Sequence, residues 1–582
     1  MIKRLIYRPE VVLGLFLLVV TYLFIWSEDT WRKDTLSSDG RGYYAYLPAV
    51  LIFQDLSYES NTEALDEQLD LHFSHHYILK DLEGNTFNKC FPGVAIVQLP
   101  LFLIATFLSF LFGLPINGYN DLYLISITLT GILSAVTGFH YLKKLLIALD
   151  FTVQISIISA MTIFVGTNVF FYALWGGSIG HIHSYAAIAA FLYYSKTFIT
   201  KESIRSGAIA CFLLSLIFII RPTNILVVLL IPYLAGSFNQ LKKALRHLFN
   251  KRNWIAPMLL GLIPILTLPA IWYAQTGHFV VWSYSDEGFY FTNPKMWSTL
   301  FSFRNGLFIY SPLALLALLS IYYVSTKSKF QGIFLSLYFL INVYVISSWW
   351  CFAYGGGFGH RVFVEHQVFF GILLAYGISY FPFRKLLLST LCLLVTLSLL
   401  QTYQYTVGIL PSGYCTAEIY FHTFLKFDPS YEGACSPRND EYYYGATVKT
   451  TELTPEPKYF EFSEHEDFQM EATYSIKDIA EDHRIYLELD YSKMRLESSQ
   501  FDEVFFVVDG TNEEGNTVFY TSFPLYEIRS EALNQWKEIH LGSQLPRENI
   551  TSYKMYIWNK GRHTFKIKDI HYTIKHISAK DM

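Results

Sequence analysis

Residues 386–405 read LLLSTLCLLVTLSLLQTYQY, a run of twenty positions without a charged side chain that directly follows Arg384 and Lys385. An α-helix of about twenty apolar residues is long enough to cross the hydrocarbon core of a bilayer. The two runs that flank Arg221 and Pro222 are shorter, which indicates a broken pair. Together with these two, ten apolar runs precede the run at 386–405. They lie near 11–26, 122–142, 152–173, 184–199, 206–220, 225–237, 254–274, 307–324, 330–348 and 363–381. The sequence therefore predicts a polytopic α-helical membrane protein with about eleven transmembrane helices.

The composition agrees with a membrane protein for most of the chain. Hydrophobic residues make up 52% of the 582 positions, charged residues 16% and aromatic residues 18%, and bilayer interfaces collect Tyr and Trp. The net charge of -4 hides an asymmetry. Residues 1–405 carry 26 Lys and Arg against 19 Asp and Glu, whereas residues 406–582 carry 18 against 29. Neither part has the basic stripe of a nucleic-acid-binding protein, so we expect no nucleic acid partner.

The basic residues set the expected orientation in the membrane. A further apolar run near 94–113 decides how the loops alternate, because counting it as a span would reverse the loops that follow. If it does not span, 17 Lys and Arg residues up to Tyr405 lie on one side and 9 on the other. The positive-inside rule makes the richer side the cytoplasm. We therefore expect 94–113 to be an interfacial segment interrupted by Pro92, Pro100 and Pro115.

The expected location is the inner (cytoplasmic) membrane of the cell, with the N-terminus cytoplasmic and the C-terminal domain extracytoplasmic. Residues 1–405 form the predicted transmembrane domain, in which 27–121 is a first outer loop with interfacial helices. Residues 406–455 are expected to be an irregular connector. Cys415 and Cys435 lie in that outer stretch, where they could form a disulfide.

Residues 456–582 are expected to form a separate domain. Apolar and polar side chains alternate with a period of two in segments such as 484–490 (RIYLELD), 503–509 (EVFFVVD) and 553–558 (YKMYIW). Asp509-Gly510 and Lys560-Gly561 are typical of turns between strands. Several short strands without an intervening helix predict an extracytoplasmic antiparallel β-sandwich of jelly-roll type.

Ionisable residues gather on the predicted outer face of the membrane domain. Charged groups at membrane depth are costly and tend to mark function. The predicted cytoplasmic loops offer solvated clusters of lysine and arginine. Separate outer loops bring an acid, a lysine, three arginines and three histidines to one face: Asp39, Lys89, His181, His183, Arg221, Arg304, His360 and Arg361.

Two short motifs in the first outer loop carry a family resemblance. Asp39-Gly40-x-x-Tyr43-Tyr44 resembles the first-loop acidic motif of GT-C glycosyltransferases. Lys89-x-x-Pro92-Gly93 is similar to the Lys-Tyr-Pro-Pro-Gly signature that precedes their interfacial helices, although Cys90-Phe91 departs from it. The pattern resembles protein O-mannosyltransferases and lipid A aminoarabinose transferases over roughly residues 1–405. It implies an enzyme that takes a sugar from a polyprenyl phosphate at the outer face.

The residues fit such a reaction on chemical grounds. A sugar phosphate ester is already activated, so transfer needs a base for the acceptor hydroxyl and cations for the departing phosphate. Asp39 is the candidate base, and its alternative role is to cap a turn before Gly40. The candidate donor-phosphate ligands are Lys89, Arg221 and Arg361, because guanidinium and ammonium groups bind phosphate. Arg221 has the alternative of a snorkelling interfacial charge.

Other outer-face residues are candidates to line the substrate pocket. His181 and His183 are two positions apart and do not face each other on a helix, so a metal is not favoured and no certain cofactor is expected. Glu365 and His366 are expected to orient Arg361, and Glu365 and Asp286 are the next candidates for the base. The predicted pocket residues are Tyr43, Tyr44, His181, His183, Arg304, His360 and Glu365.

Three functions compete. The first is a glycosyltransferase of the cell envelope that moves a sugar from a polyprenyl-phosphate donor to a glycan, lipid or protein acceptor. The second is a transporter or flippase of lipid-linked glycans, which would need polar residues along a path through the bilayer. The third is an anchor for the C-terminal domain, which would need one helix only. The predicted spans are nearly free of polar residues, so the sequence favours the transferase.

Overall fold

The computed structural model describes residues 8–28, 30–69, 77–81, 83–250, 252–284, 287–411, 415–433, 435, 447–455, 458–465, 467–476, 483–496, 504–525, 533–547 and 550–578. The chain divides into two compact units. The first unit comprises Met1–Ser285, Tyr310–Tyr344 and His360–Leu399. The second comprises Asp286–Ile309, Val345–Gly359 and Leu400–Met582.

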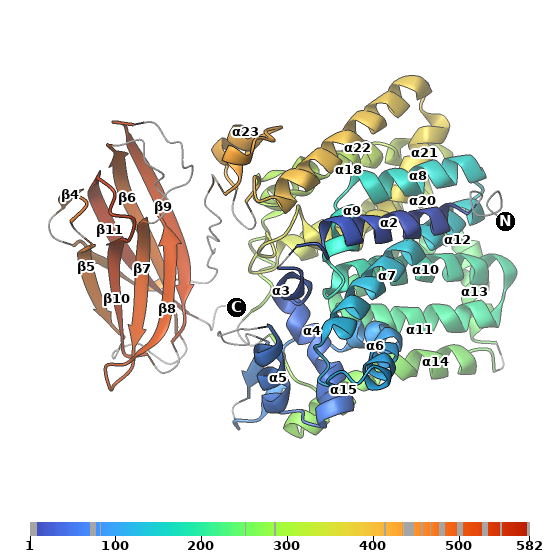
Figure 1. Cartoon of the computed structure of the whole chain (residues 1–582). Helices are drawn as coiled ribbons and strands as arrows, with labels where there is room; N and C mark the ends of the chain where they lie inside the picture. The colour runs from blue at the N-terminus through green and yellow to red at the C-terminus, as the bar shows by residue number, and fades with distance from the viewer. Residues whose placement is uncertain are drawn as a thin grey trace. The chain divides into compact units, whose positions relative to one another are not determined.

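Helices fill the first unit (Figure 1), and several of them begin at recognisable signals. Asn120, Thr152 and Ser203 accept hydrogen bonds from the first-turn amides of α7, α8 and α11, as good N-cap residues do. Its helices are α2 (Pro9–Phe24), α3 (Trp31–Thr35), α4 (Asp39–Pro48), α5 (Glu59–Leu69), α6 (Gly93–Leu111), α7 (Asp121–Ala148), α8 (Val153–Gly166), α9 (Val169–Trp175), α10 (Gly180–Lys201), α11 (Ile204–Ile220), α12 (Ile231–Ala235), α13 (Phe238–Leu248), α14 (Ile255–Ile265), α15 (Thr267–Thr276), α18 (Pro312–Leu318), α19 (Ile321–Lys327) and α21 (Gln367–Tyr380).

Shorter elements and two helices shared between the units complete the helical part. A π-helical turn η1 (Ala49–Phe53) follows α4, and a small hairpin pairs β1 (Ile78–Lys80) with β2 (Thr86–Asn88). The remaining helical elements are η2 (Pro222–Leu230), α16 (Met296–Phe301), α17 (Leu307–Tyr310), α20 (Lys329–Ser347), η3 (Arg361–Val364), α22 (Arg384–Thr406), α23 (Ala417–Thr423) and η4 (Pro429–Tyr431).

Every predicted apolar run coincides with one helix or with consecutive helices. Fewer of these elements than expected have the length of a full span. Among the described residues, five are long and apolar enough to cross a membrane, and two bent pairs raise the number to seven. The five are α6, α7, α14 with α15, α20 and α22. The helical part is that of a multi-pass membrane protein, while the count of eleven crossings stays a prediction.

The prolines expected to interrupt 94–113 do not break α6. Pro92 precedes the helix, and Pro100 lies inside one continuous helix of 19 residues. A proline removes a single backbone donor, and an apolar helix can keep its other hydrogen bonds around it. The expected interruption at Pro100 is therefore wrong, and α6 has the length and composition of a span.

Contacts at the ends of α2 and α7 bear on whether α6 crosses the membrane. Glu10, in the first turn of α2, bonds to His140 and Lys143 near the end of α7. Arg32, in α3 beyond the other end of α2, forms a 2.7 Å ion pair with Asp121, the first residue of α7. Helices α2 and α7 are thus antiparallel neighbours, and the chain between them leaves and returns on the same side.

Both ends of α6 contact this same outer segment. Before α6, the Cys90 carbonyl accepts a 2.6 Å hydrogen bond from the Tyr46 hydroxyl. After α6, the Gly118 carbonyl accepts a 2.6 Å hydrogen bond from the Tyr44 hydroxyl. A single crossing by α6 would separate these partners by the bilayer. These contacts favour the interfacial placement of α6, which stays a prediction.

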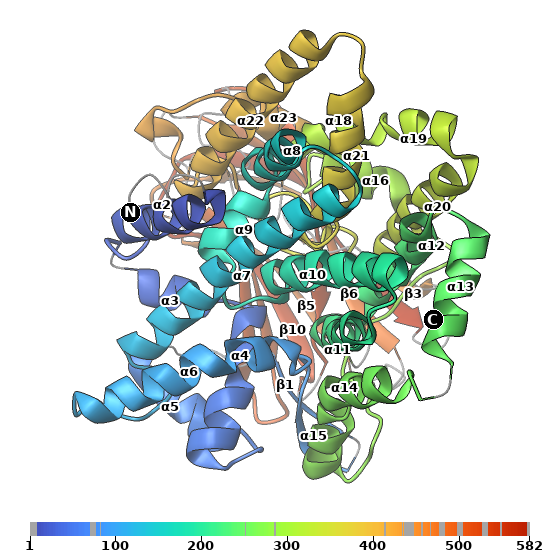
Figure 2. The same ribbon diagram turned by 90° about the vertical axis from the view of Figure 1, so that its right-hand side faces the viewer.

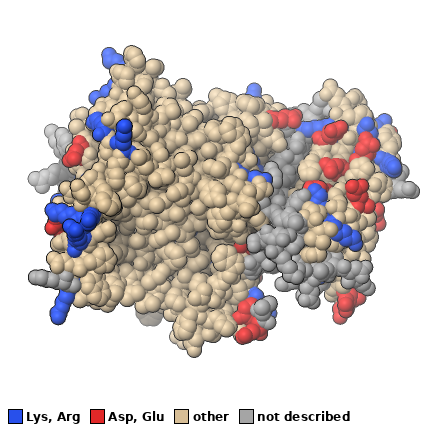
Figure 3. Space-filling model, turned by 180° about the vertical axis from the view of Figure 1, so that it is seen from behind, with Lys and Arg blue, Asp and Glu red and all other residues tan. Residues whose placement is uncertain are grey.

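Helix α10 lies in the middle of the bundle. It packs against α7 on one side and α11 on the other, and α11 packs against α14, as the end-on view shows (Figure 2). On one face of this unit, Lys and Arg side chains gather at one end of a broad band that lacks charged residues (Figure 3). A wide uncharged band with a basic border is what a bilayer-embedded surface requires.

The C-terminal part of the chain is rich in β-strands. Two antiparallel sheets have the strand orders β3-β11-β6-β9, with β4 also paired to β11, and β5-β10-β7-β8. Strand alternation between the sheets follows the order of a jelly roll, and one buried core contains residues of both sheets. The strands are β3 (Thr447–Leu453), β4 (Tyr459–Phe462), β5 (Phe468–Ser475), β6 (His483–Arg495), β7 (Val504–Thr511), β8 (Thr517–Pro524), β9 (Trp536–Leu545), β10 (Ser552–Asn559) and β11 (Phe565–Ser578).

Two local expectations for this part were wrong. Asp509-Gly510 does not form a turn but lies inside β7, where a side chain at Gly510 would meet Ile550 and Phe519 at 3.0 Å. The turn comes later, at Gly515, which has a φ of +81°. Strand β3 falls inside the expected connector, because its mostly exposed, Thr-rich sequence carries no apolar alternation. Cys415 and Cys435 are both buried, and their disulfide stays a prediction.

Candidate active site

Two glycines bring three helix ends together in the first unit. A Cβ on Gly93, the first residue of α6, would lie 2.5–2.6 Å from the backbone of Ile219 and Ile220 at the end of α11. A Cβ on Gly180, the first residue of α10, would lie 3.1 Å from the Ile220 side chain. Arg221 follows directly in extended conformation, with a φ of −152°. These contacts place the arginine where the three helices meet.

Helix α4 presents Asp39 at its first position. A Cβ on Gly40 would lie 2.3 Å from Ser178 Oγ, so α4 packs tightly on the loop that precedes α10. Asn88 donates a 2.8 Å hydrogen bond to the Gly42 carbonyl and fixes α4 to the segment before α6. Both early glycines of the motif therefore serve close packing. The start of α4 also suits an acid, since the helix dipole favours negative charge there.

Asp39 and Arg361 form an ion pair, with 3.0 Å between Oδ2 and Nη2. Burial disfavours the charged guanidinium, but the Asp39 carboxylate together with Tyr172 and Tyr43 more than offsets burial, and the pKa of Arg361 is raised. Gly355 and Gly359, in the run that leads to Arg361, have φ values of +69° and +62°. Glycine adopts this left-handed backbone without a side-chain clash, so the run supplies the turns that deliver the arginine.

Glu365 lies at the centre of a second cluster. Its Oε1 is 2.8 Å from His181 Nδ1 and 3.3 Å from Arg221 Nε. The Glu365 side chain has no exposed surface and His181 is nearly as buried. A buried carboxylate needs cationic or hydrogen-bonding partners, and here they come from the start of α10 and the end of α11.

Glu365 and His366 do not hold Arg361 as the sequence suggested. Glu365 bonds to Arg221 instead, and His366 Nδ1 is 2.8 Å from the Tyr338 hydroxyl. Consecutive residues that leave a short η3 turn point in different directions, so they reach different helices. The expectation that both orient Arg361 was wrong.

Lys89 and Tyr43 lie in the same neighbourhood. The Lys89 ammonium is 5.7 Å from the centre of the Tyr284 ring. Burial raises the pKa of Tyr43, and its hydroxyl lies within electrostatic reach of Tyr284, Arg221 and Asp39. The structure thus brings together Asp39, Tyr43, Lys89, His181, Arg221, Arg361 and Glu365.

Other predicted site residues lie elsewhere in the fold. The Tyr44 hydroxyl donates to the Gly118 carbonyl, and its ring packs on Phe102 in the core. His183 bridges the Ser134 hydroxyl and the Gly177 carbonyl, at 2.8 and 3.0 Å. Both residues therefore hold helices in place.

The last predicted residues divide between the two units. His360 belongs to the first unit and directly precedes Arg361 in the chain. Its carbonyl accepts a 3.3 Å hydrogen bond from Asn168. Arg304 is buried in the second unit. Asp286 lies outside the described residues.

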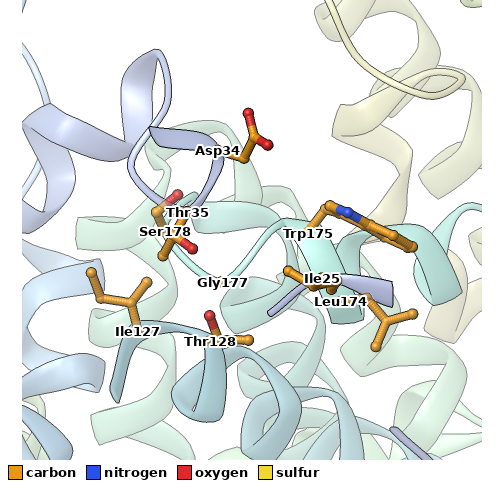
Figure 4. Close-up of a pocket in the computed structure, with 9 residues that line it drawn as sticks. All are labelled: Ile25, Asp34, Thr35, Ile127, Thr128, Leu174, Trp175, Gly177 and Ser178. Carbon is orange, nitrogen blue, oxygen red and sulfur yellow. The ribbon is translucent and has the colours of Figure 1, made fainter. Parts of the chain in front are cut away.

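A small pocket opens beside Ser178. Figure 4 shows Asp34, Thr35 and Trp175 around it, contributed by α3 and the end of α9. Its other lining residues are Ile25, Ile127, Thr128, Leu174, Gly177 and Ser178. Ser178 also packs on Gly40, the residue that follows Asp39 in the chain. The pocket is therefore close to Asp39.

Sequence reasoning missed residues that hold the site together. Ser178 and Asn88 contact the glycines of α4, and Asn224 donates a 3.1 Å hydrogen bond to Ser184 beneath Arg221. Small polar residues are common in loops and give no distinctive signal. Among the described residues, no group of three or more His, Cys, Asp or Glu is arranged to hold a metal ion.

Comparisons with known proteins concern the fold. No protein-family model matches the chain, and no curated protein matches it. Solved structures that are similar to the chain include three at low identity and low TM-score. The VP2 subviral particle of infectious bursal disease virus shares 9% identity at a TM-score of 0.18, over 24% of this chain and 36% of that one.

The other two similar structures are larger matches. The archaeal oligosaccharyltransferase AglB from Archaeoglobus fulgidus shares 12% identity at a TM-score of 0.37, over 68% of this chain and 55% of AglB. The arabinosyltransferase EmbB from Mycobacterium smegmatis shares 9% at 0.34, over 93% of this chain and 62% of EmbB. This chain thus spans less than two thirds of either one. Scores this low assign no activity to this chain.

Proposed function

We propose that this protein is a membrane glycosyltransferase that moves a sugar from a polyprenyl phosphate to an acceptor hydroxyl at the outer face of the membrane. One observation carries the proposal. Three segments far apart in the sequence bring the acid Asp39 against Arg361, beside Arg221 with its buried partner Glu365. An acid next to two cations is what proton removal and phosphate departure together require.

The proposed roles follow from the geometry. Arg361, Arg221 and Lys89 bind the donor phosphate, because guanidinium and ammonium groups match its charge. Asp39 takes the proton of the acceptor hydroxyl as that oxygen bonds to the sugar carbon. The bond from the sugar to the phosphate breaks, and the polyprenyl phosphate leaves with the electron pair.

The ion pair adds a coupling between donor and base. Without donor, Arg361 neutralises the Asp39 carboxylate across 3.0 Å. A donor phosphate competes for the same guanidinium, and its arrival would turn Arg361 away from Asp39. The carboxylate is then a stronger proton acceptor, since a nearby cation stabilises its ionised form.

The orientation of the chain is part of the proposal. The residues of the site lie at the ends of helices opposite those that carry the basic pairs. For example, α10 begins beside Arg221 and ends at Lys201, next to Glu202, which pairs with Lys243 at 2.7 Å. The positive-inside rule places that basic end in the cytoplasm. The site then faces the outside, where polyprenyl-phosphate sugars would meet acceptors.

The test is an Asp39→Asn variant in reconstituted membranes. Asparagine keeps the shape and a hydrogen bond to Arg361 but does not accept a proton. Transfer should fall by about 10²–10⁴-fold, as for loss of a general base. Because the competing carboxylate charge is gone, the KM for a polyprenyl-phosphate sugar should stay level or fall.

A matched control is Asp81→Asn, a partly exposed acid of the same loop that bonds only within its own turn among the described contacts. It should transfer at close to the wild-type rate. A folded Asp39→Asn protein with wild-type turnover would leave Asp39 as a helix-start residue. Loss of donor binding without loss of turnover on bound donor would instead make it a structural partner of Arg361.

A further inference from the structure

The outer surface of the sheet β5-β10-β7-β8 carries a set of aromatic side chains. Met470, Val508 and Met555 of this sheet face the shared core. Neighbouring positions in a strand face opposite sides, so Phe505, Tyr520, Tyr556 and Trp558 lie on the outer surface. Phe468 joins them because it pairs with Trp558, beyond a register shift between β5 and β10. We call Phe468, Phe505, Tyr520, Tyr556 and Trp558 the aromatic face.

Four of these rings contact one another across strands β5, β10 and β7, and Tyr520 lies on the next strand, β8, opposite Asp509. The Phe468 and Trp558 rings are nearly parallel, with centroids 5.9 Å apart and planes at 16°. Phe505 lies 6.1 Å from Trp558 on the other side, and Tyr556 lies 5.7 Å from Phe468. Phe468 is 49% exposed and Tyr520 is 53% exposed. Phe505, Tyr556 and Trp558 are half-buried between them. A contiguous, partly open aromatic surface of this kind often marks a binding site.

Charged side chains between the rings are paired within the face. Lys554 forms a 3.0 Å ion pair with Glu471 and lies 5.5 Å from the Tyr556 ring. The Tyr556 hydroxyl donates a 3.0 Å hydrogen bond to Asp509. The register places Lys554 opposite Asp509 on the neighbouring strand. The face therefore offers many hydrogen-bonding atoms but little excess charge.

This combination selects against two kinds of partner. Burial of Lys554, Glu471 and Asp509 in lipid would be costly, so a membrane surface does not suit the face. A nucleic acid or another polyanion needs a basic surface, whereas residues 406–582 carry 18 basic and 29 acidic residues. The charge balance complements an uncharged partner that is rich in hydroxyl groups.

We propose that the aromatic face binds an extended, uncharged glycan chain. The C–H faces of sugar rings carry slight positive charge and stack on the negative faces of aromatic rings. Their hydroxyl groups reach the carboxylates, the ammonium group and the Tyr hydroxyls at the edges. A row of rings across neighbouring strands, about 5 Å apart, suits several consecutive sugars rather than one.

The proposal stands apart from the proposed transfer reaction. Its residues belong to the second unit, and none of them is part of the candidate active site. Binding should therefore survive in the Asp39→Asn variant. Failure of one proposal leaves the other intact.

The experiment measures binding of neutral hexasaccharides to the full chain in phosphatidylcholine nanodiscs. Sugar-headed detergents are avoided because they would compete. The probes are the gluco-, manno-, xylo- and galacto-configured hexamers, the corresponding monosaccharides, and a sulfated hexamer. At least one neutral hexamer should bind, and its monosaccharide should bind much more weakly. Trp558→Ala should raise the Kd for the bound hexamer by about tenfold or more, as expected for loss of a central aromatic contact.

Two further variants keep the result interpretable. Phe468→Ala changes a half-exposed residue on the edge strand β5, so its effect can be read even if Trp558→Ala fails to fold. Trp536→Ala removes a 38% exposed aromatic of the other sheet and should not change binding. Absence of binding to every neutral hexamer, preference for the sulfated one, or an equal effect of Trp536→Ala would each overturn the proposal.

Discussion

Glu365 illustrates how a buried charge can organise a site at the scale of single residues. Its carboxylate meets a histidine from α10 and an arginine from the end of α11, and its side chain has no exposed surface. Removing one partner of a buried pair costs more than the pair contributes, because the other charge is left in the interior. The orientation of Arg221 therefore depends on a residue 144 positions further along the chain.

Glu365→Gln should destabilise the protein and disturb the donor site. Breaking a buried charged pair costs about 3–5 kcal/mol, which should lower the thermal midpoint of the purified protein. Displacement of Arg221 should reduce transfer on the order of 10²-fold, as misplacement of a binding group does. Thermal unfolding measures the loss of stability, and the transfer assay measures the loss of activity.

Glu202→Gln is the matched control for this prediction. Glu202 also pairs with a cation and a histidine, but the Lys243 partner is 67% exposed, and exposed pairs contribute little. It should leave stability and transfer unchanged. Equal effects of the two variants would mean that Glu365 has no special place in the site.

The candidate residues could be predicted one by one, but their partners could not. Asp39, Arg221 and Arg361 were recognisable because charged residues are few in an apolar chain and these three lie in loops predicted to share one face of the membrane. The pairing of Glu365 with Arg221 rather than Arg361 depends on the direction in which η3 leaves the loop. Tyr44 and His183 have the same residue types as site residues, and only packing shows that they face the core.

At the scale of elements, glycine decides how closely the helices approach. Gly93 allows the start of α6 to rest on the backbone at the end of α11, next to Arg221. Backbone cannot move aside as a flexible side chain can, so a methyl group there must push the helices apart. Lys89 and Arg221 lie on the two sides of that contact.

Gly93→Ala should therefore weaken both stability and transfer. Overpacking costs about 1–3 kcal/mol, and the loss of transfer should exceed what the thermal shift explains. Gly14→Ala in α2 is the control, because its Cβ would meet only Val136 at 3.6 Å. Alanine also has the higher helix propensity, so Gly14→Ala should be as stable as the wild type or more stable.

The sequence of helix α6 predicts a helix but does not decide whether that helix crosses the membrane. Its apolar length fits a span as well as an interfacial helix, and prolines did not break it. The basic-loop count favoured the interface, and the contacts of Tyr44 and Tyr46 at its two ends point the same way. The strands were easier to predict, since alternation with a period of two located β6, β7 and β10, whereas Gly510 misled because glycines serve packing as well as turns.

At the scale of the whole molecule, the orientation has a direct test. Single cysteines at Asp81 and Asn117, before and after α6, are introduced into a protein without its six native cysteines. In spheroplasts an impermeant maleimide should label both positions. It should reach a cysteine at Lys144 or Arg252 only after the membrane is permeabilised.

Labelling at Asn117 only after permeabilisation would show that α6 crosses the membrane. The basic ends of later helices would then face outward, and the proposed outer site would lose its orientation. A reporter fused at the C-terminus gives an independent check and should lie outside. A cytoplasmic reporter there would contradict the parity of the crossings.

The antiparallel pairing of α2 with α7 has a consequence for how the protein is made. In the proposed orientation, everything between these two helices, including the charged residues of α3 to α5, must pass through the membrane before α7 inserts. Helix α2 meets its neighbour only after that passage, when Arg32 can reach Asp121 and Glu10 can reach Lys143. In this orientation, assembly of the bundle depends on the translocation machinery of the cell. Helix α2 stays in the membrane without its α7 contacts until the segment that carries Asp39 has been exported.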